Sequence, residues 1–260
     1  MKTNIRPDSE NDGWNFKPFF ICYPIAIFLA LTFFTDYRDP VWRTVDVAFF
    51  RLLNDTLAEN NVWTTFIAWC NSGPFDAALG AIMAFLSFWV FFHPGFGDFK
   101  ERFARITAVV FAVLIPVVLA KQIFRNFERL SPARDLDVFF NLNELVPEIS
   151  AKVGSSSSFP GNHGVASVML VLCFFIFFRR YPGLVAVTIP IAIVNAFPRL
   201  IGGGHWLSDI IVGAGSFALL TYPLLVGTPY LRYMRRFTSA MTDHILTPVL
   251  EKVGLVRFMR

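Results

Sequence analysis

Charge is scarce in this chain. Asp, Glu, Lys and Arg make up 16% of its 260 residues, whereas hydrophobic residues make up 55% and Phe alone occurs 31 times. A soluble domain has about 25% charged residues, because polar side chains must cover much of its surface. This composition excludes a water-soluble globular domain and predicts a polytopic membrane protein.

Cysteine is also scarce. Cys22, Cys70 and Cys173 each stand alone within an apolar stretch, which excludes a disulfide framework or a thiolate metal site and favours a packing role. The net charge of +4 is modest, and no basic stripe with interleaved aromatic residues is present. The expected partners are therefore a membrane and its lipids, and not nucleic acid.

Long apolar runs make up much of the sequence. Several approach the lower limit of about 17 residues for crossing a bilayer. We expect an all-α fold: a polytopic membrane helical bundle with six transmembrane helices, forming a single domain over residues 1–260. The predicted spans are 18–35, 72–92, 106–121, 163–178, 182–198 and 207–229.

The segments between and around these spans also carry signals. Residues 1–17 are polar and lack the features of a signal peptide, so the first span is read as a retained helix. Residues 41–58 place apolar residues at helical spacing with Arg and Asp between them, which predicts an interfacial helix. The connection 122–162 exceeds the usual limit of about 12–15 residues, which favours a functional role. Within it, residues 136–146 either enter the outer leaflet or cover an acyl chain, or form a surface helix.

The distribution of Lys and Arg predicts the orientation. These residues collect between spans two and three, between spans four and five, and in the basic tail 231–260, so both termini are expected in the cytoplasm. The connections 122–162 and 199–206 then face the periplasm of a bacterial inner membrane. The residues that carry this prediction are Lys100, Arg102, Arg105, Arg179, Arg180, Arg232, Arg235, Arg236, Lys252, Arg257 and Arg260.

A polar motif interrupts the apolar helices near residue 200. Arg199 is followed after five residues by His205 and after three more by Asp209. A His and an Asp four residues apart lie on one helix face, so the carboxylate can hold one imidazole nitrogen and leave the other free to attack. Arg199 adds a bidentate donor for phosphate oxygens. The motif predicts a phosphoryl-transfer site.

A second polar motif, Ser-Phe-Pro-Gly-Asn-His at 158–163, precedes the fourth span. Gly161 lets backbone N–H groups approach an anion closely, near the expected start of a helix at His163. Asn162 is also a good helix cap. We expect this motif to bring a second His to the same site.

These motifs resemble those of the type 2 phosphatidic acid phosphatase (PAP2) superfamily, whose later motifs usually run Pro-Ser-Gly-His and Ser-Arg, five residues, His, three residues, Asp. Here the last motif keeps its spacing with Pro198 in place of Ser, and the middle one reads Pro-Gly-Asn-His. The first superfamily motif is Lys, six residues, Arg-Pro. In this chain Lys121 is followed by seven residues before Arg129, and Leu130 replaces Pro.

The resemblance implies a mechanism without a metal or an organic cofactor. His205 would be the nucleophile that forms a phosphohistidine, Asp209 would hold its tautomer, and His163 would protonate the leaving oxygen. Arg125 and Arg134 are possible substitutes among the phosphate ligands. The implied ligands are Arg199, Arg129, Lys121, Gly161 and Asn162.

The variant Ser-Phe-Pro-Gly-Asn-His-Gly is most similar to the lipid A 1-diphosphate synthases, which move a phosphate from undecaprenyl pyrophosphate onto lipid A. The resemblance therefore implies a membrane lipid phosphotransferase. A lipid phosphatase needs the same first half-reaction and uses water as the acceptor, so this alternative stays open.

Two other classes compete with this interpretation. His163, His205 and Asp209 also fit a facial metal triad, although a metal leaves Arg199 without a task. A transporter or an assembly subunit would also tolerate charged residues in its helices. The lack of repeat halves and the clustering of charge at one face favour an enzyme.

Overall fold

Every regular element in the described part of the chain is helical. The computed structural model describes residues 13–36 and 38–252, so the predicted segments 1–17 and 231–260 lie partly outside the described residues. Within these ranges the β-bridges are isolated pairs. The all-α prediction is confirmed, and Cys22, Cys70 and Cys173 are free and buried, as packing residues would be.

Five helices among the described residues are long and apolar enough to cross a bilayer. Their outer faces expose large apolar side chains, such as Phe20 at 79% and Phe85 at 69%, which suits contact with lipid and not with water. The five are α1 (Lys17–Phe34), α4 (Gly73–Phe92), α5 (Phe99–Ile123), α9 (Pro182–Ile201) and the segment Asp209–Gly227, in which the π-helix η3 (Asp209–Ala214) continues as α10 (Gly215–Gly227).

The remaining predicted span corresponds to α8 (Asn162–Phe177), an apolar helix of 16 residues. At 1.5 Å per residue it is about 24 Å long, shorter than the roughly 30 Å hydrocarbon core. The count of six transmembrane helices therefore stays a prediction.

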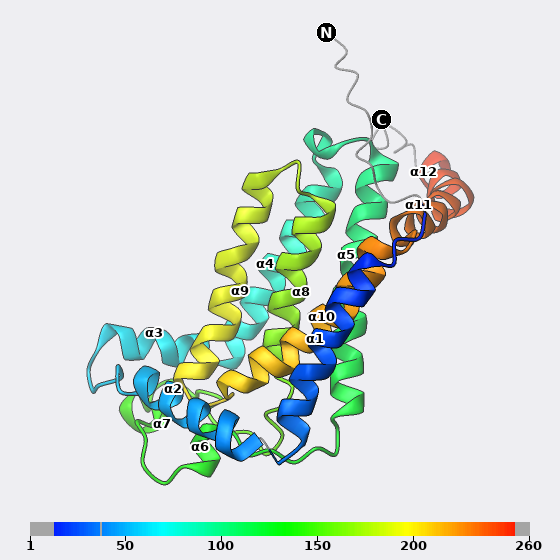
Figure 1. Cartoon of the computed structure of the whole chain (residues 1–260). Helices are drawn as coiled ribbons and strands as arrows, with labels where there is room; N and C mark the ends of the chain where they lie inside the picture. Colours follow the sequence, from blue (N-terminus) through cyan, green and yellow to red (C-terminus); the bar gives the residue numbers. More distant parts are fainter. Residues whose placement is uncertain (1–12, 37, 253–260) are drawn as a thin grey trace.

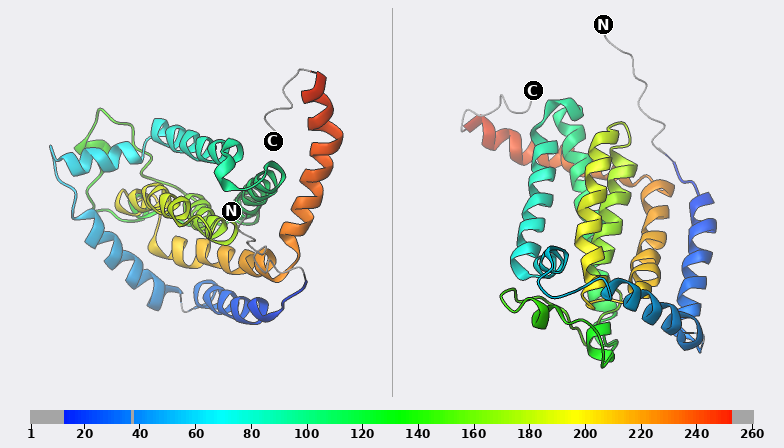
Figure 2. Two further views of the ribbon diagram at one scale, coloured as in Figure 1. Left: turned by 90° about the horizontal axis from the view of Figure 1, so that it is seen from above. Right: turned by 90° about the vertical axis from the view of Figure 1, so that its left-hand side faces the viewer.

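Helix α8 lies at the centre of the bundle (Figures 1 and 2). It packs against α9, α5, η3 and α10. Its buried face includes Val165, Met169, Cys173 and Phe174, all with no exposed surface. Because α8 packs against four other elements, the chain that enters it has a fixed position.

Short helices cover the end of the bundle opposite the termini (Figures 1 and 2). Helix α2 runs across this end. In the run 136–146, Leu142 is fully buried against Ile67 and Ile201, whereas Val138 is 84% exposed. The elements here are η1 (Arg38–Arg43), α2 (Thr44–Asn54), α3 (Val62–Cys70), α6 (Pro132–Asp135) and α7 (Leu142–Leu145).

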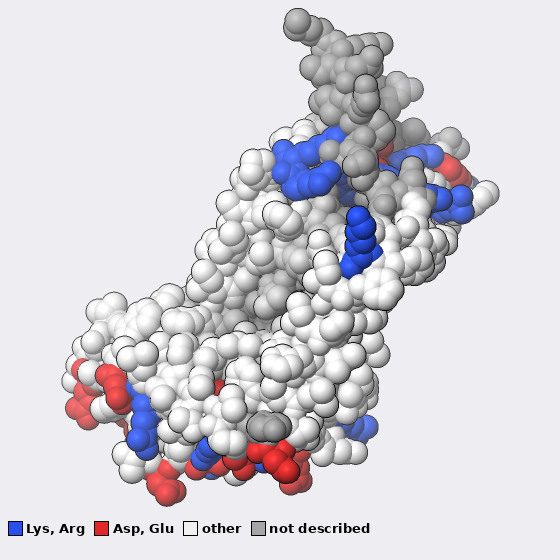
Figure 3. Space-filling model, in the orientation of Figure 1, with Lys and Arg blue, Asp and Glu red and all other residues white. Residues whose placement is uncertain are grey.

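Charged residues gather at the two ends of the molecule (Figure 3). Lys and Arg crowd the end near the termini, acidic residues are prominent at the other end, and the surface between them carries few charges. This pattern suits a protein whose middle lies in a bilayer. The end near the termini is completed by η2 (Pro94–Phe96), α11 (Tyr230–Met241), η4 (Thr242–Leu246) and α12 (Thr247–Lys252).

Candidate active site

His205 and Asp209 lie side by side where the chain enters η3. The Nδ1 atom of His205 is 3.4 Å from Oδ2 of Asp209, whose side chain is fully buried. Oδ2 also accepts a hydrogen bond of 2.9 Å from the backbone N–H of Trp206, which fixes the carboxylate. The separation slightly exceeds a normal N–H···O hydrogen bond, and contacts of this kind often tighten when substrate binds. The pair leaves Nε2 of His205 as the nitrogen that can attack.

Arg129 connects Asp209 to α2. Its Nη1 donates to Oδ1 of Asp209, and its Nη2 donates to Oδ2 of Asp46 at 2.7 Å and to Oγ of Ser208 at 2.8 Å. The guanidinium also lies over the ring of Phe33, 4.8 Å from its centroid. Arg129 therefore has both terminal nitrogens engaged by protein groups, and these contacts position Asp209. Its role as a phosphate ligand stays a prediction.

Asp46 is a buried carboxylate on α2 that faces the same arginine. Its Oδ1 accepts from the backbone N–H of Ser208 at 2.8 Å, and its Oδ2 accepts from the Ser208 hydroxyl at 2.5 Å. Burial raises the pKa of Asp46, although the Ser208 hydrogen bonds and the charge of Arg129 lower it. Burial is the largest of these effects, so the pKa stays above its usual value, and the charge of the nearby Asp209 raises it further.

Replacing Asp46 with Asn should therefore change how stability depends on pH. A carboxyl with a raised folded-state pKa contributes stability below its unfolded pKa of about 3.9, and this contribution is lost as the pH rises through the folded value. The amide that replaces the carboxyl does not titrate, so the variant should gain stability relative to wild type between about pH 4 and neutral pH. Thermal unfolding of both proteins in detergent across this range checks the sign. A relative loss in the variant would show that the Arg129 pair outweighs the burial of Asp46.

Arg199 forms a second cluster on the other side of the site. It is 4% exposed and lies in the last turn of α9. Its Nη2 pairs with Oδ1 of Asp76, its Nη1 donates to the backbone oxygen of Asn71 at 3.2 Å, and its Nε is buried without a hydrogen-bond partner. Lys152 binds the other oxygen of Asp76 at 2.9 Å. A buried guanidinium with an unsatisfied N–H is well suited to donate a hydrogen bond to a bound anion.

His163 lies in the first turn of α8 and faces His205. The two ring centroids are 6.4 Å apart. The Nδ1 atom of His163 is 3.2 Å from Oδ1 of Asn195, whose amide nitrogen donates to the backbone oxygen of His163 and to Oγ of Ser167. Because Oδ1 accepts, Nδ1 carries the proton and Nε2 is left to exchange one with substrate. Reacting atoms approach to about 3–3.5 Å, so the gap suits one phosphoryl group between the rings.

Gly161 lies in the second motif, directly before the first residue of α8. Its φ of +73° lies in the left-handed region, which Gly adopts without strain. A Cβ atom here would come within 3.4 Å of Ile210 and 3.5 Å of Asp209. Asn162, the first residue of α8, is exposed. The first N–H groups of a helix have no partner within it, so this helix start offers donors to an anion beside Asp209.

The other predicted cations lie farther from this arrangement. Lys121, in the last turn of α5, and Arg125, just beyond that helix, are exposed. Arg134 is exposed and lies against Gly154. No hydrogen bond or ion pair in the described ranges connects Lys121 to His205, Asp209 or Arg199. Its role as a phosphate ligand stays a prediction, as do those of Gly161 and Asn162.

Three polar residues that hold the site belong to none of the predicted motifs. Asp46 and Asp76 each bind one of the two arginines, and Asn195 holds His163. Each is a polar residue within or at the start of an apolar helix. A polar side chain that is costly to bury was the only available signal, because its partner is distant in the sequence.

The geometry does not favour the metal triad. One oxygen of Asp209 accepts from Arg129, and the other accepts from the backbone N–H of Trp206, with Nδ1 of His205 3.4 Å away. The described residues contain no group of three His, Cys, Asp or Glu side chains arranged to hold a metal ion. The guanidinium next to the carboxylate would also repel a cation.

The fold and the site define a membrane-embedded enzyme of the phosphatase and phosphotransferase type: the chain belongs to the PAP2 superfamily. The model of that superfamily matches residues 103–230. The chain is 31% identical over 217 residues to the Lipid A 1-diphosphate synthase of Escherichia coli (strain K12), a match that covers 79% of this chain and 85% of that protein. No solved structure matches the chain. The superfamily resemblance inferred from the motifs is confirmed.

Proposed function

We propose that this protein is a lipid phosphotransferase that moves a phosphate from undecaprenyl pyrophosphate to the 1-phosphate of lipid A through a phosphohistidine. The observation that carries the proposal is the pair of imidazoles, 6.4 Å apart between centroids. Asp209 lies next to Nδ1 of His205, and Asn195 lies next to Nδ1 of His163, so Nε2 of each ring is left for the substrate. The name of the relative from Escherichia coli supports lipid A as the acceptor.

In the first half-reaction His205 attacks the terminal phosphorus of the lipid pyrophosphate in line. The new P–N bond forms as the P–O bond to the bridging oxygen breaks. His163 enters this step as the imidazolium, with protons on both nitrogens, and gives its Nε2 proton to the departing lipid phosphate. Asp209 stabilises the positive charge that develops on His205. Arg199 and the first N–H groups of α8 stabilise the equatorial oxygens.

In the second half-reaction an oxygen of the acceptor phosphate attacks the phosphohistidine. His163 takes the proton of the acceptor, the P–N bond breaks, and His205 returns to its neutral form. The acceptor oxygen occupies the position that the leaving oxygen had, because the two steps share one geometry and one acid-base group. Water in that position would give a phosphatase.

We also propose that the active-site end faces the periplasm of a bacterial inner membrane, with both termini in the cytoplasm. The support is the excess of Lys and Arg at the end near the termini (Figure 3). A single Cys introduced at exposed Asn60, near the active-site end, should react with a membrane-impermeant maleimide in whole cells. The same probe should leave a Cys at exposed Gly183, at the opposite end, unlabelled.

The function is tested with purified protein in detergent and undecaprenyl pyrophosphate labelled on its terminal phosphate. With lipid A present, label should move onto the glycolipid, and a His205→Ala protein should give none. Label released only as free phosphate would make the protein a pyrophosphatase. An absence of turnover would overturn the donor assignment.

A further inference from the structure

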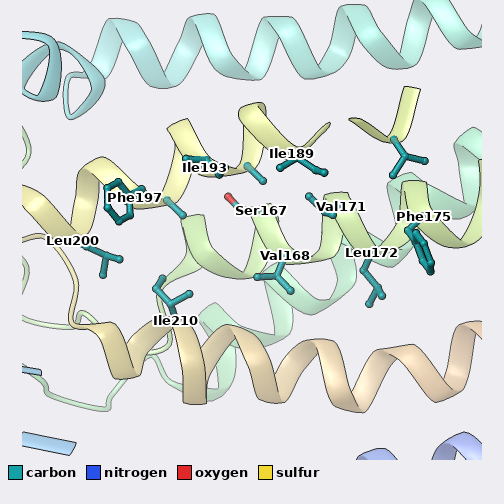
Figure 4. A pocket seen from close by; sticks show the side chains of 13 residues that line it. Ser167, Val168, Val171, Leu172, Phe175, Ile189, Ile193, Phe197, Leu200 and Ile210 are labelled. Atoms are coloured by element: carbon teal, nitrogen blue, oxygen red, sulfur yellow. The ribbon is translucent and has the colours of Figure 1, made fainter. Parts of the chain in front are cut away.

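An apolar groove leads away from the active site between α8 and α9 (Figure 4). We call it groove A. It has a volume of about 610 Å³, within the range of roughly 300–1,000 Å³ in which small organic ligands bind. Leu200 and Ile210 line one end, Phe175 lines the other, and Ser167 is the polar exception in an otherwise hydrocarbon lining.

A second apolar groove lies between α1 and the η3–α10 segment. This groove, B, has a volume of about 260 Å³, and the end of α5 forms part of its wall. The aromatic ring of Phe159 lines it and stacks on Phe33 at a centroid distance of 4.6 Å. Phe33 in turn lies under the guanidinium of Arg129. Groove B therefore begins at the aromatic cluster that supports the arginine of the site.

The two catalytic motifs separate the grooves. After Asp209, Ile210 lines groove A, whereas Val212 and Gly213 line groove B. The chain on either side of the start of α8 shows the same arrangement, because Phe159 lines groove B and Ser167, one turn beyond His163, lines groove A. Both grooves thus start within a few residues of the two imidazoles and then diverge, groove A running between α8 and α9 and groove B running between α1 and the η3–α10 segment.

We propose that the two grooves bind the hydrocarbon chains of two different lipid phosphates that share one headgroup position. Groove A takes the isoprenoid chain of the donor pyrophosphate, and groove B takes an acyl chain of the phosphorylated glycolipid acceptor. This inference rests on the proposed function. It explains how an acceptor can reach the phosphohistidine without competing for the hydrocarbon site of the departing donor.

Charge at the two grooves supports this assignment. Leu200 in groove A directly follows Arg199, and Ser167 follows His163 by one helical turn, so the donor headgroup would meet Arg199 and His163 as its chain enters. At groove B, exposed Arg125 directly follows the lining residue Phe124, and exposed Lys121 lies two residues before the lining residue Ile123. Two cations so close in sequence to the lining of an apolar groove suit a lipid that carries a phosphate, and they give Lys121 a role outside the catalytic cluster.

Photochemical labelling tests the proposal without requiring turnover. One probe is an isoprenyl pyrophosphate with a methylene bridge between its phosphorus atoms and a diazirine in its chain. The other is a phosphorylated glucosamine lipid with a diazirine in one acyl chain. With wild-type protein, the first should label peptides of α8 and α9, and the second should label peptides of α1 and α10.

Variants that fill each groove should separate the two probes. Ala192→Trp fills groove A and should lower labelling by the first probe about tenfold, or roughly 1.4 kcal/mol of binding, while the second probe is unaffected. Ala30→Trp fills groove B and should do the reverse. Val187→Trp and Phe28→Trp, on exposed faces of the same two helices outside the grooves, are the matched controls and should change neither labelling.

The outcomes also distinguish this inference from the proposed function. Labelling of both grooves by one probe, or unchanged labelling in Ala30→Trp, would overturn the two-groove assignment whatever the transfer assay shows. Equal labelling of groove B by an uncharged diacylglycerol with the same diazirine would overturn it too, because groove B would then hold bulk lipid. Correct labelling by both probes together with release of free phosphate only would retain the grooves and reject the phosphotransferase.

Discussion

Replacing His205 with Ala is expected to lower turnover by a factor on the order of 10⁴–10⁶, the size seen when a covalent nucleophile is removed. The variant keeps Asp209, held by Arg129 and Trp206, and it keeps the phosphate-binding groups. It loses the group that, among the described residues, is placed to form the covalent bond, since His163 is held by Asn195 on the other side of the gap. The protein should therefore still bind lipid phosphate while failing to turn it over.

Trapping the intermediate gives the most direct measurement. Wild-type protein incubated with terminally labelled lipid pyrophosphate and quenched in alkali should carry a labelled phosphate that is stable to base and lost in acid, as expected of a phosphohistidine. His205→Ala should carry none. His163→Gln is the matched control, because it should slow labelling without removing the labelled site. Acid-labile label persisting in His205→Ala would assign the nucleophile to another residue, and the roles of the two imidazoles would have to be exchanged.

Helix α5 is longer than the span predicted from the sequence. The predicted span covers 106–121, whereas the helix extends over Phe99–Ile123. Four charged residues lie in its first turns, Lys100, Glu101, Arg102 and Arg105, and charged residues lower the apolar character on which the prediction depends. In the structure Arg102 is 3% exposed and donates to the backbone oxygen of Phe91, and Arg105 pairs with Glu101. Partners brought by the fold make these charges tolerable in a helix.

The candidate site divides in a similar way between local and distant contacts. The His205–Asp209 pairing follows from their separation of four residues, so the sequence predicts it directly. The partner of Arg129 on α2 is 83 residues away, and the partner of Arg199 on α4 is 123 residues away. Spacing along one helix carries no information about such contacts. They arise only once α2 lies across the end of the bundle and α4 packs near α9.

Arg199→Lys should lower kcat/KM by about 10²–10³, the loss expected when a preorganised donor to a developing charge is removed. Lys retains the positive charge and can still pair with Asp76, but it lacks the planar fork and the Nε–H that the structure leaves buried without a partner. The transition state should lose a charge-assisted hydrogen bond that the free protein did not satisfy internally. Folding should change little, because the ion pair with Asp76 survives.

Lys152→Ala provides the matched control. Lys152 binds the same carboxylate as Arg199, at 2.9 Å, but its side chain is 61% exposed, and exposed ion pairs contribute about 0–1 kcal/mol. Its removal should change kcat/KM less than about fivefold. Initial rates over a range of lipid concentrations, with thermal unfolding of each variant, separate catalysis from stability. Unchanged kcat/KM in Arg199→Lys would mean that any cation suffices at this position. An equal loss in both variants would instead mean that Asp76 must be held from both sides for the site to form, and that Arg199 acts through the carboxylate and not on the phosphate.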